Sequence, residues 1–253
     1  MLPGPDLVCA CPDCEAIVRV GSLASWNNFG AIQWTDGRLG GETIPTGAAI
    51  RRCTSCGRFH WLRDLRELGE IDFFEPNVKP PEAWTKAPFV PTDLPESTWF
   101  EALDAGLGRT IAEEIRLRYE AFMAANDELR YRDDGRHRDA TRENMKRLDA
   151  LLARRRGDDL LLRAEILREL GRFAEARRLL EPDRWRVVEV IRVHDVRGTH
   201  IEKQEKRGLR KVRDRLLELC GKRDRRVRPV EPRAVEAMLG TQLEAMANLS
   251  PRT

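Results

Sequence analysis

The pattern of apolar and polar positions divides the chain into a strand-like first third and a helical remainder. In residues 1–74, short apolar runs rich in aromatic and β-branched side chains are bounded by turn-forming residues, a pattern typical of β-structure. The predicted strands cover residues 16–20, 31–35, 50–52 and 58–62. Asp36-Gly37 directly follows the second of these strands and is a favoured two-residue turn, so we expect a β-hairpin there.

From residue 109 onward, the apolar residues recur with the spacing of an amphipathic helix. The first predicted helix spans residues 109–131, and its inward face carries Ile111, Ile115, Tyr119, Phe122 and Leu129. The same spacing predicts further helices over residues 140–155, 158–170, 173–181, 205–220 and 232–247.

The stretch 184–196 carries signals of two kinds. Its β-branched run over residues 187–193 favours a strand, whereas Pro182 before it and the helical surroundings favour a helix. We interpret this stretch as a helix and keep the strand as the alternative.

Six prolines between residues 76 and 95 mark a change of composition. Proline lacks the backbone donor and favours extended chain, so this Pro-rich segment is interpreted as a linker that Trp84 and Phe89 hold against the surface. The sequence therefore predicts an α+β protein in four parts. These parts are a small β-rich domain over residues 1–75, the linker over 76–95, an all-α domain over 96–200 and a basic helical segment over 201–253.

Four of the six cysteines form two CxxC pairs, Cys11 with Cys14 and Cys53 with Cys56. Each CxxC turn presents two thiolates from one tight loop, and two such loops complete the tetrahedral shell that Zn²⁺ prefers. Gly57 supplies backbone freedom, and the 38 residues between the pairs leave room for an inserted hairpin. We therefore predict one zinc ion in a zinc-ribbon-like N-terminal domain. Because four thiolates leave no open coordination position, the predicted site is structural rather than catalytic.

Other interpretations of these residues stay open. Cys9 could replace Cys11 as a ligand, and His60, four residues after Cys56, could also bind the metal. Redox-active CxxC pairs would require a thioredoxin-like βαβ context, which this Trp- and Gly-rich segment does not offer. We interpret Cys9 as a reduced thiol beside the site, His60 as a strand residue and Cys220 as a small buried apolar residue.

The charges are spread unevenly along the chain. The whole chain has a net charge of +3, whereas residues 197–233 carry 14 Lys and Arg against 6 Asp and Glu, a net charge of +8. The basic stretch 203–228 is therefore where a nucleic acid or an acidic partner would bind. It lacks interleaved aromatic residues, so stacking on single-stranded bases is not indicated. Elsewhere carboxylates alternate with arginines along the predicted helices, and we expect solvated ion-pair faces.

No targeting signal or catalytic motif accompanies these features. The first residues, MLPGPDLVCACPDC, lack the basic and apolar regions of a signal peptide, and no apolar run approaches the about 18 residues of a transmembrane helix. We therefore expect a cytoplasmic protein without membrane contact, whose cysteines stay reduced. Residues 106–110 have glycines but lack the Gly-Lys-Ser/Thr ending of a phosphate loop, which predicts a plain helix–helix connection.

Residues 161–180 resemble a tetratricopeptide repeat across its helix–turn–helix core. Gly171, Phe173 and Ala176 match the turn glycine, the aromatic residue and the small packing residue of that repeat. The match covers about 20 residues of a repeat of roughly 34 and ends where Pro182 comes early. The resemblance implies a scaffold that binds a peptide or a protein, a role that stacked repeats usually fill.

The N-terminal segment combines the two CxxC pairs with Ser25-Trp26-Asn27, Trp34-Thr35-Asp36-Gly37 and Phe59-His60-Trp61. This combination resembles a group of uncharacterised bacterial proteins with a zinc ribbon followed by helices. The resemblance implies an architecture and no activity.

The leading hypothesis is a zinc-stabilised adaptor or scaffold that binds a protein partner and catalyses no reaction. A closed four-thiolate site, a repeat-like helix pair and the lack of a catalytic motif support it. The first alternative is a nucleic-acid-associated protein that uses the ribbon and the basic segment. The second is an enzyme with a cleft between its domains. The partner, the process and the oligomeric state do not follow from the sequence.

Overall fold

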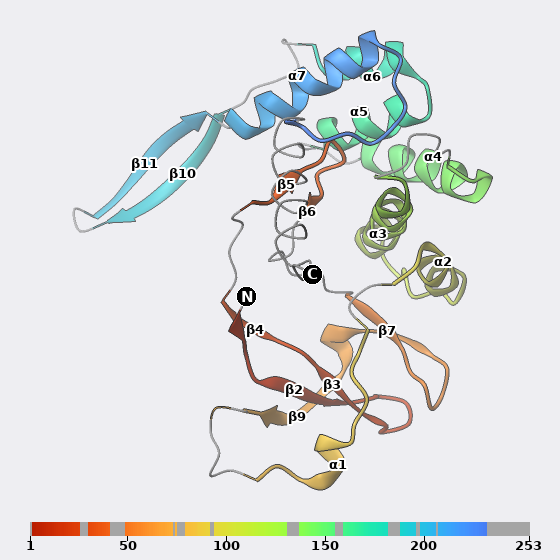
Figure 1. The fold of residues 1–253 in the computed structure, drawn as a ribbon, viewed down its shortest axis with the longest axis vertical. Coiled ribbons are helices and arrows are strands. Elements are labelled where there is room, and N and C mark those ends of the chain that lie inside the picture. Colours follow the sequence, from red (N-terminus) through yellow and green to blue (C-terminus); the bar gives the residue numbers. More distant parts are fainter. Residues whose placement is uncertain are drawn as a thin grey trace, which may run out of the picture. The chain divides into compact units, whose positions relative to one another are not determined.

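The computed structural model describes residues 2–25, 30–40, 49–72, 74, 79–91, 94–130, 137–154, 159–181, 188–195, 198–205 and 207–231, with the backbone alone for those between 188 and 208. Contacts along the chain form two compact units (Figure 1): residues 1–31 and 40–125 make up the first, and residues 32–39 and 126–253 the second. The second unit is therefore built from two stretches that are far apart in the sequence. Strands and helices are both present, so the predicted α+β class is confirmed.

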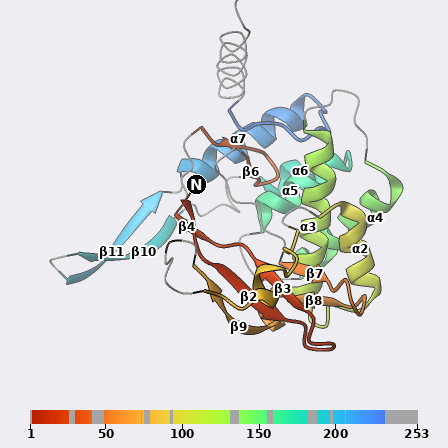
Figure 2. The same cartoon turned by 60° about the horizontal axis from the view of Figure 1, so that its bottom comes forward.

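The first unit contains small antiparallel sheets. Its strands are β1 (Leu2–Pro3), β2 (Asp6–Ala10), β3 (Ile17–Val20), β4 (Leu23–Ser25), β7 (Ile50–Arg52), β8 (Phe59–Trp61) and β9 (Arg66–Ile71). The largest sheet has the order β3-β2-β9 (Figure 2), and the others pair β1 with β4 and β7 with β8. The strands predicted at 16–20, 50–52 and 58–62 are confirmed. The apolar pattern does not predict β9, because Glu67 and Glu70 leave that strand mostly polar.

The Pro-rich segment lies along the edge of this sheet at β3. The backbone of Arg19 forms two hydrogen bonds with it, one to Pro88 (2.9 Å) and one to Val90 (2.8 Å). The Arg19 guanidinium stacks on Phe89 at 4.0 Å from the ring centroid, and the indole of Trp84 lies against β9. Trp84 and Phe89 thus hold the segment against the sheet, as predicted. The segment also contains a one-turn helix, α1 (Glu82–Thr85), where extended chain was expected.

Two further helices pack on the β7–β8 hairpin within the first unit. These are α2 (Glu96–Asp104) and the first part of α3 (Ile111–Leu129). Ile50 and Trp61 of the hairpin form a buried cluster with helix and loop residues Trp99, Ala102, Leu107, Leu117 and Ala121. This packing extends the first unit to residue 125, so the domain boundaries predicted at residues 75 and 95 do not coincide with the compact units. Ile111, expected on the inward face, is 61% exposed because it stands at the very start of α3.

The second unit combines a hairpin with helices. Its described elements are β5 (Ile32–Gln33), β6 (Leu39–Gly40), the end of α3, α4 (Asp139–Ala153), α5 (Leu160–Glu169), α6 (Phe173–Leu179), β10 (Val188–Asp195), β11 (Gly198–Glu205) and α7 (Arg207–Gly221). Helices α5, α6 and α7 share a buried apolar cluster that includes Ala164, Ala176 and Leu216. The helices predicted between residues 140 and 220 are confirmed except over 184–196, and the one predicted over 232–247 lies outside the described residues.

The hairpin of β5 and β6 turns at Asp36-Gly37, as predicted. It is joined to the segment that follows α7. The backbone N–H of Thr35 donates to the carbonyl of Arg228 (2.9 Å), and the N–H of Val230 donates to the carbonyl of Gln33 (2.8 Å). This inserted hairpin therefore completes the helical unit, although it precedes that unit by about 90 residues in the sequence.

The interpretation of residues 184–196 as a helix is wrong over 188–195, the part that the structure describes, where the strand alternative is correct. β10 pairs with β11 as an antiparallel ribbon in a continuous register from Val188 opposite Glu205 to Asp195 opposite Gly198. Val and Ile are stiff at χ1 and favour extended backbone, so the β-branched run outweighs the helix-start signal of Pro182.

The expectation of solvated ion pairs is wrong for α5. Glu165, Arg168 and Glu169 are fully buried, and the Arg168 Nε lies 2.7 Å from Glu165 Oε2. Buried charges are retained only when paired and hydrogen-bonded, and these side chains obtain further partners from the inserted hairpin and from α3.

Candidate metal centre

Each CxxC pair lies at the turn of a β-hairpin, the first between β2 and β3 and the second between β7 and β8. The two turns have the same local hydrogen bond. The N–H of Glu15 donates to the carbonyl of Cys11 (3.0 Å), and the N–H of Gly57 donates to the carbonyl of Cys53 (2.8 Å). The donor residue is left-handed in both turns, with φ of +57° at Glu15 and +74° at Gly57. Two equivalent turns thus present the cysteines.

We predict opposite effects for substitutions at these equivalent positions. A Cβ at Gly57 would meet no atom within 4 Å, so Gly57→Ala costs only the left-handed strain of about 1 kcal/mol. Glu15→Gly removes the same strain and loses only an exposed ion pair with Arg66, so it costs nothing or stabilises by up to about 1 kcal/mol. Urea unfolding of the zinc-loaded protein measures both. Equal destabilisation by the two changes would show that the turns are not equivalent.

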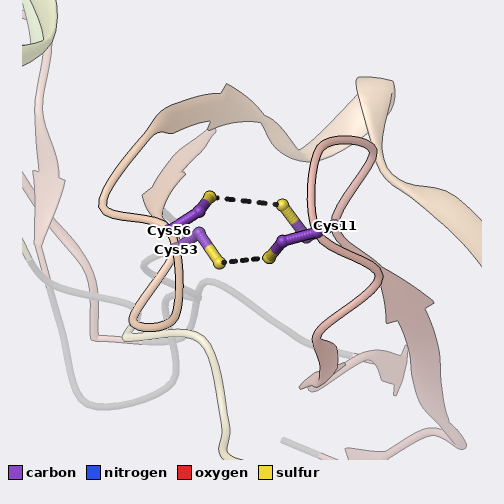
Figure 3. Close-up of side chains that lie close together, drawn as sticks. Cys11, Cys53 and Cys56 are labelled. Atoms are coloured by element: carbon purple, nitrogen blue, oxygen red, sulfur yellow. Dashed lines mark hydrogen bonds between the residues drawn. The ribbon is translucent and has the colours of Figure 1, made fainter.

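The two turns bring four sulfur atoms together (Figure 3). The Sγ of Cys11 lies 3.8 Å from that of Cys56, and the Sγ of Cys14 lies 3.6 Å from that of Cys53. All four sulfur atoms lie within 4.8 Å of one another. A disulfide would require about 2.05 Å, and these cysteines are free. The predicted site residues therefore converge, and the group is close enough to bind a metal ion.

Because the sulfur atoms lie close together, the pKa values of their thiols differ from one another. Burial raises the pKa of Cys53, but hydrogen bonds from the backbone N–H groups of Cys56 and Ser55 and from the neighbouring thiols lower it to about 6 overall. A backbone hydrogen bond from Ala16 lowers the pKa of Cys14, yet burial and the other cysteines raise it to about 12. Negative charge thus collects on one sulfur, and a bound divalent cation is what would let several thiolates share this space.

Cys9 is not part of the sulfur group. Its side chain packs with Val18, Leu65 and Val90 in a buried apolar cluster, and burial raises the pKa of its thiol. The interpretation of Cys9 as a thiol beside the site is therefore supported. Cys220 lies in the apolar cluster of the second unit, as predicted.

His60 contacts the sulfur group from one side. Its Nε2 lies 3.4 Å from the Sγ of Cys11 and 3.4 Å from Oδ2 of Asp13, and the residue is buried in β8. His60, Asp13 and Cys56 also form a second group of ligand atoms within 4.8 Å. The four cysteines alone offer as many ligand atoms as a tetrahedral ion takes, and a histidine in contact with such a sulfur atom is of the kind that orients a metal ligand.

A cavity of about 930 Å³ lies beside the sulfur group in the first unit. Its walls come from both cysteine turns, the C-terminal end of α2 and the loop before α3. Most of its charged side chains form ion pairs, namely Arg58 with Asp13 (3.1 Å), Arg52 with Glu101 (3.0 Å) and Arg109 with Asp64 (3.1 Å). Asp104, the last residue of α2, has no ion-pair partner among the described residues. Sequence reasoning missed this cavity, because its walls come from four separate stretches.

The loop over residues 106–110 also contributes to the cavity, but it offers no anion site. The backbone N–H groups of Arg109 and Thr110 donate to Oε2 of Glu113 (3.0 and 3.2 Å), and the N–H of Glu113 donates to Oγ1 of Thr110 (3.2 Å). This capping box uses the backbone donors of Arg109, Thr110 and Glu113 at the start of α3. The loop is thus the helix–helix connection that the sequence predicts.

The basic residues at the C-terminal end of α7 and after it are largely engaged with neighbours. Arg215 and Lys222 both pair with Glu218 (2.6 Å each), and Arg228 pairs with Asp224 (3.1 Å). These contacts form the ion-pair face expected of a solvated helix. A nucleic-acid role for residues 203–228 stays a prediction.

The longest helix in the described part of the chain, α3, has 19 residues and carries seven charged side chains. No helix among the described residues is long and apolar enough to cross a membrane. Comparisons of the chain with protein-family models, with curated proteins and with solved structures find no match.

Proposed function

We propose that this chain is a zinc-stabilised binding protein without a catalytic role, whose first unit accepts a cationic segment of a protein partner. One zinc ion, bound by the four clustered cysteines, keeps the first unit folded. The cavity beside it binds the partner. The observation that carries the proposal is the carboxylate of Asp104, which has no ion-pair partner in the part of the chain that the structure describes, in a cavity whose other charged side chains are paired. The proposal includes a cytoplasmic location, because a reducing compartment keeps the thiols available for the metal.

The sulfur–sulfur distances support zinc as the metal. Four sulfur atoms placed tetrahedrally about 2.3 Å from one ion stand about 3.8 Å from each other. Two of the separations are 3.6 and 3.8 Å, and all four sulfur atoms lie within 4.8 Å of one another, so little rearrangement is needed on binding. Two hairpins that each contribute one CxxC turn also agree with a zinc-ribbon-like domain. Four thiolates close the coordination shell, which favours a structural ion over a catalytic one.

The charge of the cavity supports a cationic ligand. The arginines on its walls are already neutralised by carboxylates, and the N-terminus of α3 is occupied by Glu113. Asp104 stands at the C-terminal end of α2, where the helix dipole is also negative, so the helix end adds to its charge. A lysine or arginine side chain of a partner would satisfy both the carboxylate and the helix end.

The helical unit supports a second contact for a protein partner. We include a tetratricopeptide-like character of α5 and α6 in the proposal. Gly171 has φ of +81° at the turn between these helices, Ala176 is buried, and Phe173 packs against the shared core. These residues are the ones that match the repeat in the sequence.

Peptide binding tests the proposal. We expect a fluorescein-labelled peptide of alternating lysine and alanine to bind the zinc-loaded protein, with an affinity that falls as salt is added. A matched peptide of glutamate and alanine should not bind. Asp104→Lys should weaken the basic peptide at least about tenfold, which corresponds to about 1.4 kcal/mol. Fluorescence anisotropy measures each affinity.

Asp139→Lys is the matched control, because Asp139 is an exposed acid of α4 that does not line the cavity. It should leave peptide affinity unchanged. Equal binding of the acidic peptide, or an Asp104→Lys protein that binds normally, contradicts the proposal. Salt-sensitive binding of an oligonucleotide, without binding of the basic peptide, would instead support the nucleic-acid alternative.

A further inference from the structure

A buried network of charges lies in the second unit, away from the cysteines. Its members come from the inserted hairpin, from the end of α3 and from α5. The carboxylates are Asp36, Glu165 and Glu169, each with 0% side-chain exposure, and the guanidiniums are Arg130 with 4% and Arg168 with 0%. Such a network is stable only if its charges balance, since an uncompensated buried charge costs several kcal/mol.

The guanidiniums are committed to two of the three carboxylates. Arg130 Nη2 lies 2.7 Å from Oδ2 of Asp36. Arg168 binds Glu165 through two bonds of 2.7 Å, from Nε and from Nη2. Glu169 is left 3.8 Å from the already bound Arg168. Three carboxylates against two guanidiniums leave one negative charge in excess at Glu169.

His137 stands where this excess charge can be neutralised. Its Nε2 lies 2.6 Å from Oε2 of Glu169, and its side chain is 9% exposed. A single proton on this pair, whether on the imidazole or on the carboxyl group, brings the network to neutrality. Asn126 Nδ2 bonds both Glu169 (3.3 Å) and Asp36 (2.9 Å), so the pair is linked directly to the hairpin.

Among the described residues, the other charged groups around the network do not supply that proton. Asp127 of α3 is partly exposed and pairs with Arg38 and Arg130. On the side of α7, Arg168 Nη1 donates to the backbone carbonyl of Asp224, whose carboxylate already binds Arg226 and Arg228. Burial raises the pKa of the Cys220 thiol, so that group stays neutral.

We propose that the proton shared by Glu169 and His137 is a pH-sensitive latch that holds the inserted hairpin in the helical unit. The hairpin reaches the network through Asp36 and through Thr35, whose Oγ1 donates to Oε1 of Glu165 (2.5 Å). Loss of the proton leaves a net negative charge beside both contacts. The hairpin then separates from α5 more readily, while its own turn stays closed.

The direction of the pH dependence follows from the carboxyl groups. Burial raises the pKa of Glu165 and of Glu169 to about 7, although Arg168 lowers both. A folded-state pKa above the unfolded value of 4.5 gives stability that is present at low pH and is lost as pH rises through about 7. The latch is therefore closed near pH 5 and weakened above about pH 7.

Amide hydrogen exchange of the zinc-loaded full chain tests the latch. The backbone N–H groups of Thr35 and Val230 form the bonds that dock the hairpin, and the N–H of Trp34 bonds within it. After correction for intrinsic rates, we expect the opening constants of Thr35 and Val230 to rise about tenfold per pH unit between about pH 5 and pH 7. They should level off above about pH 7.5, and Trp34 should respond less.

Variants separate the latch from general pH effects. Glu169→Gln carries no ionisable proton, so it should reduce the slope, and His137→Gln should reduce it if the first variant fails to fold. Glu143→Gln, at a position with 74% side-chain exposure on α4, should keep the slope. Opening that does not depend on pH between about 5 and 7, or a slope that Glu169→Gln leaves unchanged, would overturn the proposal.

Discussion

Cys53→Ser is expected to unfold the first unit and to remove its metal. Cys53 is fully buried, and its sulfur belongs to the group of four. Structural zinc in small domains contributes about 10–16 kcal/mol of binding free energy at neutral pH, which exceeds the about 5–15 kcal/mol that stabilises a typical domain. Loss of one thiolate should therefore leave the β7–β8 hairpin without its anchor. Metal analysis should find about one zinc per chain in the parent protein and none in the variant.

Cys9→Ser provides the matched control, because Cys9 is also a buried cysteine of the first unit but packs only with apolar side chains. The serine hydroxyl in that cluster should lower the free energy of unfolding by about 1–3 kcal/mol and leave the zinc content at about one per chain. Circular dichroism with added chelator completes the test. A zinc-free Cys53→Ser protein that unfolds at the parent temperature would remove the structural role of the metal. Loss of zinc from Cys9→Ser would assign Cys9 as a ligand.

The sequence predicts the cysteine centre well because its signal is local. Each CxxC pair lies within four residues, and the β-strands on both sides follow from short apolar runs. Convergence of the two pairs then follows from the chemistry, since one tetrahedral ion needs both. The sequence does not predict that Cys9 lies outside the sulfur group, because Cys9 and Cys11 are separated by one residue and either could be the ligand. The position of Cys9 depends on the packing of Val18 and Leu65 against β2.

The buried charges could not be predicted from the sequence. Glu165, Arg168 and Glu169 have the spacing of a solvated ion-pair face, and the chain shows no local sign that they are covered. Thr35, which donates to Glu165, lies 130 residues earlier, in a hairpin predicted from its turn alone. The contact between the hairpin and α5 is visible only in the structure, where residues 32–39 belong to the same compact unit as residues 126–253. The cavity beside the metal centre escaped prediction for the same reason.

Asp36→Ala is expected to be the most damaging change in the second unit. Asp36 is fully buried and accepts two bonds from Arg130, at 2.7 and 3.2 Å. Its removal leaves Arg130 with only the partly exposed carboxylate of Asp127, and breaking a buried ion pair typically costs about 3–5 kcal/mol. The loss also frees the turn of the hairpin, because Oδ1 of Asp36 accepts the backbone N–H of Arg38 (3.0 Å). Urea unfolding followed in the helical unit measures the cost.

Asp127→Ala is the control, because it removes a carboxylate from the same arginine. Asp127 lies 2.6 Å from Nε of Arg130, but its side chain is 36% exposed. Water can replace an exposed partner, so this substitution should cost no more than about 1 kcal/mol. Both variants leave Arg130 with one carboxylate. The difference between their free energies of unfolding therefore measures the effect of burying the lost carboxylate, and not the effect of its charge. Equal costs would mean that water reaches Arg130 in the folded protein, and the inserted hairpin would then be held by its backbone bonds and not by its charge.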